Sequence, residues 1–437
     1  MKQDKDIHLF AHLMRRAGFG ATREELDELA GKGYEGVVEE LLHPDQFPEQ
    51  DDHDLLRRYG GAVGNGHYGG EWEHRMINSR RPLAEKMALF CHHVFATATE
   101  KSLGHVYEQI DMLRKFGLSD LRTILTKLSA DPAMLMWLDN QENFKDEPNE
   151  NYGRELLELF SMGVGNYTEE DVKASTMAFT GWTFETPIPG GSTRRGTFPT
   201  KFLYQGWEHD DDVKVFLGES GRFNGEDIVD IIVKQPATAR FISRHLYTFF
   251  VADEPQVASW NELPPQDPEA IDTLVKAYFD SGANMRDILR VLFNSDFFKN
   301  AQFKRVKSPV ELVIGLTRLL GTHRTPEPGQ KPLGPIGAMG QKLMNPLTVE
   351  GWHTGPEWID GGTLNSRVNF AVNEIGDADN PGVRRIIDQI STEQRLISAE
   401  EFVDKCLDLT GPIVVEEDTR LDLIGQAELG GHLRFGS

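Results

Sequence analysis

The sequence predicts a mostly α protein, built as a single large helical body with two long irregular or small-β inserts. Amphipathic helical patterns recur along most of the 437 residues. The helical period is lost in two long stretches rich in glycine, proline and tryptophan, 183–225 and 323–362. A hydrophobic share of 39% is enough to bury a substantial core around such helices.

The N-terminal half, 1–182, is predicted to be helical along most of its length. Its first strongly patterned helix starts at Thr22, a capping threonine followed three residues later by Glu25. A polar, glycine-rich connection over 45–70 leads to a second helix over 82–97, which opens on a proline that a first helical turn tolerates. Further helical patterns follow and end in the motif helix described below.

The rest of the chain divides into four segments by composition. The first insert, 183–225, has paired glycines, prolines and short aromatic runs, which predict a loop or small hairpin. Central helices are expected over 226–322, then a Gly/Trp/Pro-rich loop region over 323–372, and a polar helical tail over 373–437. Inserts as long as these often carry function.

An amphipathic helix with a uniform polar face is predicted over 149–162, called the motif helix, within the stretch PNENYGRELLELFSMGVG. At 100° per residue its apolar residues share one side, and the other side carries Glu150, Asn151, Arg154, Glu155 and Glu158. Two interpretations stay open. The spacing of two of these glutamates, four residues from the arginine, is typical of ion pairs on a solvated face. The same side chains could instead converge on a ligand or a metal.

The enzyme hypothesis gives the motif helix a catalytic role. Glu155 or Glu158 would act as general base with His92 nearby, and Arg154 would orient an anionic or carbonyl group. The reaction expected is hydrolase- or transferase-like. The alternative is a non-catalytic binding or assembly module, in which the motif is a structural ion-pair network.

A divalent metal site is a further hypothesis. Glu85 and His92 lie seven residues apart, and so on one line of a helix that is otherwise apolar nearly all round. Together with Glu155 and Glu158 they could form a metal site between helices, as in bundle cores. The usual di-iron spacing Glu-x-x-His is absent from these helices. A structural hydrogen-bond network in the core is the competing interpretation.

Five residues are candidates for ligand binding. Glu150 and Asn151 belong to the motif helix, and Trp182 and Trp352 each follow a glycine in or beside an insert. Such tryptophans can stack on a sugar ring, or simply pin a loop to the core. Arg305 lies just before a predicted helix start, where it could hold a phosphate or carboxylate or neutralise part of the motif's acid.

Charge and composition argue against several classes of function. Acidic residues outnumber basic ones by 69 to 46, giving a formal charge of −23 with no basic stripe, so nucleic-acid binding is not expected. Two cysteines are too few for a thiolate zinc site. No run has the length of a signal peptide or a membrane span, which predicts a cytoplasmic protein. Serine-hydrolase elbow, Walker, zinc-protease and dinucleotide motifs are missing.

The motif region extended to PNENYGRELLELFSMGVGNYTEEDV resembles the signature of the bacterial domain-of-unknown-function 1800 family. The resemblance spans about residues 12–370. It implies a fold and a map of motifs but no reaction. Family members are often exported and encoded beside a second uncharacterised protein family, so a protein encoded beside this one, or a glycan, is a candidate partner. The other blocks that carry the resemblance are AHLMRRAGFGAT, EKMALFCHHVFAT, AFTGWTF, NGEDIVDIIVKQPATARFI, FKRVKSPVELV and MNPLTVEGWHTGPEWIDGGTLNSRVNF.

Overall fold

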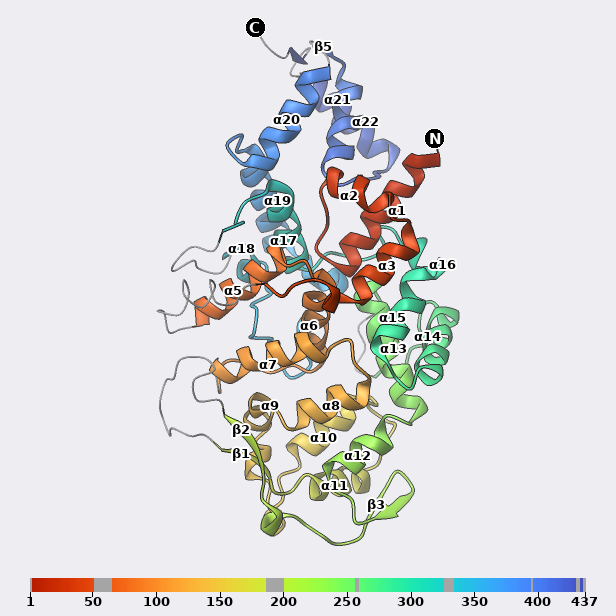
Figure 1. Cartoon of the computed structure of the whole chain (residues 1–437), viewed down its shortest axis with the longest axis vertical. Coiled ribbons are helices and arrows are strands. Elements are labelled where there is room, and N and C mark those ends of the chain that lie inside the picture. The colour runs from red at the N-terminus through yellow and green to blue at the C-terminus, as the bar shows by residue number, and fades with distance from the viewer. Residues whose placement is uncertain are drawn as a thin grey trace.

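The computed structural model describes residues 2–50, 65–101, 103–185, 200–255, 259–325, 334–393, 396–429 and 433–434. Helices dominate this part of the chain (Figure 1), and its strands form three separate two-stranded antiparallel sheets. The predicted fold class, mostly α with small β inserts, is therefore confirmed. None of the described helices combines the length and the apolar character needed to cross a membrane.

The first part of the chain is a run of helices, with α6 among them. In order they are α1 (Lys2–Ala17), α2 (Arg23–Ala30), α3 (Tyr34–Leu42), the 3-10 turn η1 (Pro44–Gln46), α5 (Asn65–Asn78), α6 (Pro82–Val94), α7 (Leu103–Phe116), α8 (Leu121–Ser129), α9 (Pro132–Trp137), the 3-10 turn η2 (Asn140–Glu142), α10 (Asn151–Glu158) and α11 (Glu169–Ala178).

The second part begins with the hairpins and returns to helices. Its elements are β1 (Trp182–Glu185), β2 (Lys201–Tyr204), η3 (Gly206–Glu208), β3 (Lys214–Phe216), β4 (Glu219–Gly221), α12 (Gly225–Ile232), α13 (Pro236–Phe250), α14 (Pro268–Asp280), α15 (Met285–Asn294), α16 (Asp296–Lys299), α17 (Pro309–Leu320), α18 (Gly334–Ala338), η4 (Gly355–Trp358), α19 (Gly361–Gly376), α20 (Pro381–Glu393), β5 (Leu396–Ile397), α21 (Ala399–Leu409), α22 (Glu417–Leu429) and β6 (Leu433–Arg434).

Helix α6 lies at the centre of the molecule (Figure 1), and nearly all of its residues are buried. Because a helix that is apolar all round must be covered on every side, neighbouring helices pack around it, among them α1, α3, α5 and α7. It ends at Val94, three residues before the predicted end at 97, and Phe95 closes it with a backbone bond to Cys91.

The motif helix is α10, and it is shorter than the predicted span 149–162. It starts at Asn151 and ends at Glu158, after which the backbone N–H groups of Phe160 and Met162 reach back five residues instead of four. Gly163 then adopts a φ of +78°, a left-handed conformation that suits glycine. The segment up to 162 is thus a wider, π-type turn rather than a continuing α-helix.

The two inserts differ in structure. In the first, β1 pairs with β2 in the register Trp182 opposite Tyr204, and β3 pairs with β4; residues 186–199 of this insert lie outside the described residues. The second was predicted as loop over 323–372, but α19 begins within it at Gly361; residues 326–333 lie outside the described residues. The two glycines at the start of α19, Gly361 and Gly362, suggest a loop. The Asp360 side chain nevertheless caps the helix by accepting hydrogen bonds from the backbone N–H groups of Gly362 and Thr363.

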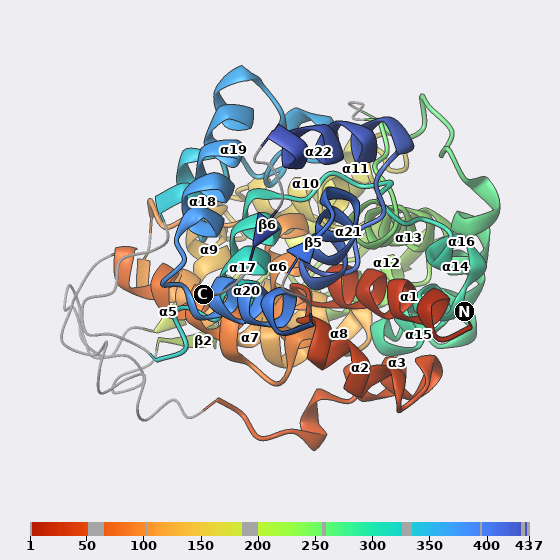
Figure 2. The same ribbon diagram turned by 90° about the horizontal axis from the view of Figure 1, so that it is seen from above.

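Helices α20 to α22 lie at one end of the long axis and the β1–β2 and β3–β4 hairpins at the other (Figure 1). Seen from above, α20 and α21 lie close to α1 and α2 (Figure 2). Side chains connect them: Arg23 Nε donates to Asp408 Oδ2 at 3.0 Å, and Gln389 Nε2 to Glu24 Oε1 at 2.8 Å. The C-terminal helices therefore pack on the N-terminal ones, at the far end of the molecule from the hairpins.

Candidate functional site

A pocket of about 660 Å³ lies near the middle of the molecule. Its walls come from the end of α6, the end of α10 with the turn after it, one face of α13, residues 259–261 and the loop 347–357. The polar and aromatic lining residues that matter for its chemistry are His93, Glu158, His245, Trp260, Arg305, Glu350 and Trp352.

The inner end of the motif helix supplies two carboxyl groups to this region. Glu158 lines the pocket, and Tyr167 Oη donates a hydrogen bond to its Oε2 at 2.6 Å. Glu155 is half-buried one turn earlier, and burial, reinforced by the charges of Glu158 and Glu350, raises its pKa to about 7. A carboxyl group that keeps its proton near neutral pH therefore stands beside a carboxylate on the pocket wall.

His93 is the imidazole at the end of α6 that faces the pocket. The backbone N–H of Trp352 donates to its Nδ1 at 3.2 Å, which leaves the proton of the neutral ring on Nε2. Burial, and secondarily the charge of Arg305, lowers the pKa of His93 to about 4. His93 is consequently a neutral hydrogen-bond donor over the physiological pH range.

Gly351 lets the loop approach His93 this closely. Its φ is +98°, and a Cβ atom at this position would lie 2.3 Å from the carbonyl oxygen of His93. Any other residue would push the loop away and break the bond from Trp352 to His93.

His245, on α13, is the second imidazole of the pocket. Its ring packs against Phe241 and Trp260, with both pairs of ring centroids 4.5 Å apart. Burial, and secondarily His93, lowers the pKa of His245 to about 3. It forms no hydrogen bond with any of the described residues, and it is only half-buried, so its ring nitrogens are available to a ligand.

The outer part of the motif helix has a different role. Arg154 donates from Nη2 to Glu169 at 2.7 Å and to Glu150 at 3.3 Å, and both glutamate side chains are exposed. Asn151 opens the helix, where its backbone N–H donates to Asn149 Oδ1. None of Glu150, Asn151 and Arg154 lines the pocket.

The structure does not bring the four predicted metal ligands together. Glu85 instead accepts hydrogen bonds from Arg114 Nε at 2.7 Å and from Trp72 Nε1 at 3.1 Å. His92 lies between the rings of Trp72 and Trp352, with centroid distances of 5.9 and 5.3 Å, and neither of its ring nitrogens has a hydrogen-bond partner among the described residues. Among the described residues no group of three or more His, Cys, Asp or Glu side chains is arranged to hold a metal ion.

The hydrogen-bond partners of Glu85 therefore come from α5 and α7 rather than from α10. Residues 85 and 92 are seven apart, so they lie about 10 Å apart along the helix axis and face different neighbours.

The three remaining predicted residues fall in different places. Trp182 is buried between Phe179 and Phe202 and does not line the pocket. Trp352 lines the pocket, but its ring is mostly buried and its Nε1 donates to the carbonyl of Lys342. Arg305 also lines the pocket and pairs with Glu311 rather than with the acidic motif.

His93 and His245 were not among the predicted site residues. On a helix buried all round, such as α6, no polar face indicates which of two adjacent histidines meets a cavity. The glycine of the Gly-Trp pair at 351–352 was the available signal, since it marks a backbone that approaches something closely.

Comparison with known proteins gives a family but no relative of known activity. No curated protein and no solved structure matches the chain. A family model described as a protein of unknown function (DUF1800) matches residues 12–430, which extends the resemblance seen in the sequence past α19 and through α22. Because this match covers nearly the whole chain, the protein belongs to the DUF1800 family.

Proposed function

We propose that the chain is an acid–base enzyme, hydrolase- or transferase-like, that acts on a small polar ligand in the pocket. One observation carries the proposal: a carboxylate, Glu158, and two imidazoles kept neutral, His93 and His245, line the same concave pocket. Imidazoles with strongly displaced pKa values beside a carboxylate in the same cleft are typical of acid–base sites.

The environments of these groups suggest their roles. His93 has a pKa too low to bind a proton near neutral pH, so it would polarise a carbonyl or phosphoryl oxygen through Nε2–H. Glu158, held by Tyr167, would accept a proton as general base. Glu155, with a pKa of about 7, would supply a proton from just behind it.

His92 and Arg154 have less support as catalytic residues. Neither lines the pocket: the ring of His92 is enclosed by two tryptophans, and the guanidinium of Arg154 is bound to two surface glutamates.

The test is a ligand screen followed by a turnover assay. Purified protein is screened by thermal shift against small polar compounds, and each compound that binds is incubated with the protein and followed by NMR. We expect Glu158→Gln and His93→Gln to lower kcat/KM by about 100-fold or more each. Arg154→Gln, the control, should change it less than about threefold.

Two results would overturn the proposal. One is a compound that binds in the pocket and is never converted; the other is a conversion that Glu158→Gln leaves unchanged.

A binding module is the second candidate, favoured by the first insert. Trp207, Tyr204 and Phe202 are exposed there by 66%, 46% and 38% of their surface. Exposed aromatic residues on one segment are typical of surfaces that bind a protein or a glycan. Two results together would favour this candidate: the pocket converts no compound, and Trp207→Ala abolishes the capture of a partner.

A further inference from the structure

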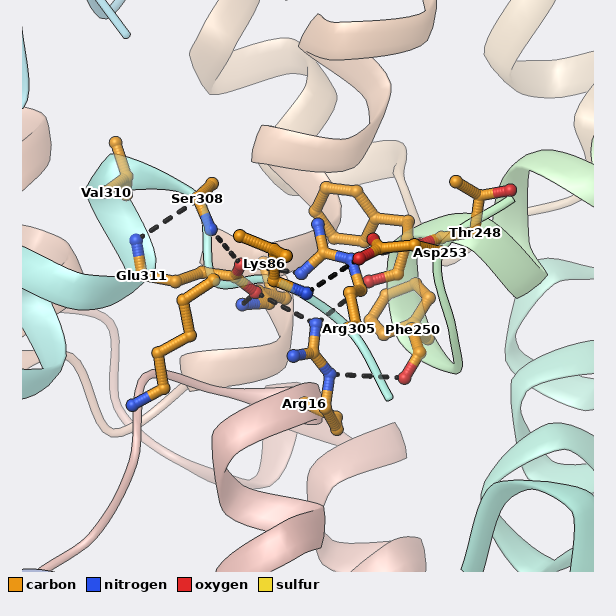
Figure 3. Close-up of polar contacts among 12 residues, drawn as sticks. Arg16, Lys86, Thr248, Phe250, Asp253, Arg305, Ser308, Val310 and Glu311 are labelled. Atoms are coloured by element: carbon orange, nitrogen blue, oxygen red, sulfur yellow. Dashed lines mark hydrogen bonds and ion pairs between the residues drawn. The ribbon is translucent and has the colours of Figure 1, made fainter. Parts of the chain in front are cut away.

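Behind the pocket wall lies a buried charged group that we call the Glu311 cluster: Glu311, Arg16, Lys86, Arg305 and Asp253. Lys86 Nζ lies 2.5 Å and Arg16 Nη2 3.2 Å from Glu311 Oε1, and Arg305 Nη1 lies 2.6 Å from Oε2 (Figure 3). At most 7% of the side chain is exposed in each of Glu311, Arg16, Lys86 and Arg305.

The cluster holds more positive than negative charge. Three cationic side chains face two carboxyl groups, those of Glu311 and Asp253. Asp253 Oδ2 accepts a hydrogen bond from the backbone N–H of Val306 at 2.8 Å, while its Oδ1 is buried and has no partner in the part of the chain that the structure describes. Burial, partly opposed by Glu311, lowers the pKa of Lys86 to about 7, as expected where cations are crowded away from water.

Arg305 connects this cluster to the pocket. Its Nε donates to the carbonyl of Thr248 at 2.9 Å and its Nη1 to Glu311. Its Nη2 forms no hydrogen bond with the described residues and is not among the buried atoms that lack a partner, so it keeps some exposure, and Arg305 lines the pocket.

The other two arginines of the pocket are already engaged. Arg244 donates to Glu254 and to the carbonyls of Trp260 and Leu263, and Arg240 donates to Asp272 on the surface. Arg305 is therefore the lining arginine with a buried, positioned guanidinium and a free donor.

We propose that the ligand of the pocket carries a carboxylate or phosphate group, which Arg305 Nη2 binds together with the Nε2–H of His93. The inference rests on the proposed function in taking the pocket as the working site, and it names the substrate class. A guanidinium held rigidly by its other two nitrogens suits an oxyanion well. Glu158 and Glu350, which also line the pocket, would repel the anionic group and so orient the ligand.

The test uses inorganic phosphate and acetate as probes of the two anion types. Protein labelled with ¹⁵N-histidine is titrated with each at constant ionic strength against chloride, and the imidazole signals are followed, that of His93 being assigned with His93→Gln. We expect a saturable shift of the His93 signal with at least one probe.

Variants locate the anion. Arg305→Gln should weaken binding at least about tenfold, since a charged hydrogen bond is lost. Arg154→Gln, which removes an exposed arginine elsewhere, should change it less than twofold. Asp253→Asn should tighten binding about two- to fivefold, because it removes a negative charge near Arg305 and keeps the oxygen that Val306 contacts.

The outcomes separate the two proposals. No saturable shift with either probe, or equal affinity in wild type and Arg305→Gln, overturns the inference. If Arg305→Gln does not fold, unchanged affinity in Asp253→Asn overturns it. Anion binding at Arg305 without conversion of any compound would refute the proposed enzyme and leave the anion site. If the protein converts an uncharged compound and phosphate does not inhibit this conversion, the anion site is refuted and the proposed enzyme stands.

Discussion

In two groups of this molecule one charged side chain is held by several side chains of opposite charge. One group is exposed to solvent and the other is buried. In one, Arg154 is held by Glu150 and Glu169, whose side chains are 56% and 62% exposed. In the other, Glu311 is held by Arg16, Lys86 and Arg305, and 3% of its side chain is exposed. The first lies within one short stretch of the sequence that also carries the family resemblance, whereas the second is assembled from three distant segments.

The comparison shows that the density of charge in a sequence does not indicate where charge matters for the fold. Exposed ion pairs gain little, because water already solvates both partners and holding long side chains costs entropy. A buried charge has lost its water, so each of its partners becomes necessary. Stability should therefore respond strongly to changes at Glu311 and weakly to changes at Arg154.

The largest effect is expected for Glu311→Ala. It leaves three cations buried around a vacated site and removes the capping box in which Glu311 accepts the backbone N–H of Ser308 at 2.9 Å. We expect the free energy of unfolding to fall by about 3–5 kcal/mol. Urea denaturation followed by circular dichroism measures it.

A control separates charge from capping. Ser308→Ala removes the side-chain half of the same capping box and keeps the carboxylate, so it should cost about 1 kcal/mol. If the two variants lose equal stability, the buried charges are not what makes Glu311 important.

A smaller effect on the free energy of unfolding, which depends on pH, is expected for Glu155→Gln. Glu155 is half-buried, so its exposure lies between that of the ion pairs of Arg154 and that of the buried Glu311 cluster. The folded protein keeps the proton of Glu155 up to a pH of about 7, whereas the unfolded chain releases it near 4.5. Stability therefore falls as pH rises through this window, because the folded state binds more protons there. The glutamine has no proton to lose, so the variant should match wild type at pH 4 and be more stable at pH 8.

Thermal unfolding between pH 4 and 8 measures this difference. Glu155→Asp, which keeps a titrating carboxyl group, should retain a pH dependence of the same sign. Parallel curves for wild type and Glu155→Gln would mean that Glu155 is solvated like the outer half of the motif.

The sequence indicated local structure better than it indicated the site. The capping pair Thr22 and Glu25 forms the predicted capping box, and the helix predicted to start at Ser308 does so. Each of these two signals is made by residues at most three apart in the sequence, so local rules are enough to predict it.

The pocket depends on contacts that no local pattern encodes. Trp352 donates to His93 across 259 residues of sequence, and Lys86 reaches Glu311 across 225. The sequence pointed to the end of α6 and to the motif helix, but it selected His92 rather than His93, because His92 lies seven residues after Glu85 on one line of the helix. One of the two roles expected for Arg305 was to neutralise part of the motif's acid, although its partner Glu311 lies only six residues later, in the first turn of α17.

The smallest effect is expected for Arg154→Ala, despite the position of Arg154 within the family motif. Among the described residues its guanidinium bonds only to exposed glutamates, so we expect a loss of at most about 1 kcal/mol in the free energy of unfolding. This loss should shrink further in 1 M salt, where charges at the surface are screened within about 3 Å. Urea denaturation at low and high salt measures both quantities. A loss of about 3 kcal/mol that salt does not reduce would show that Arg154 holds the motif helix against the body as firmly as Arg305 holds Glu311, and would remove the contrast between the two groups.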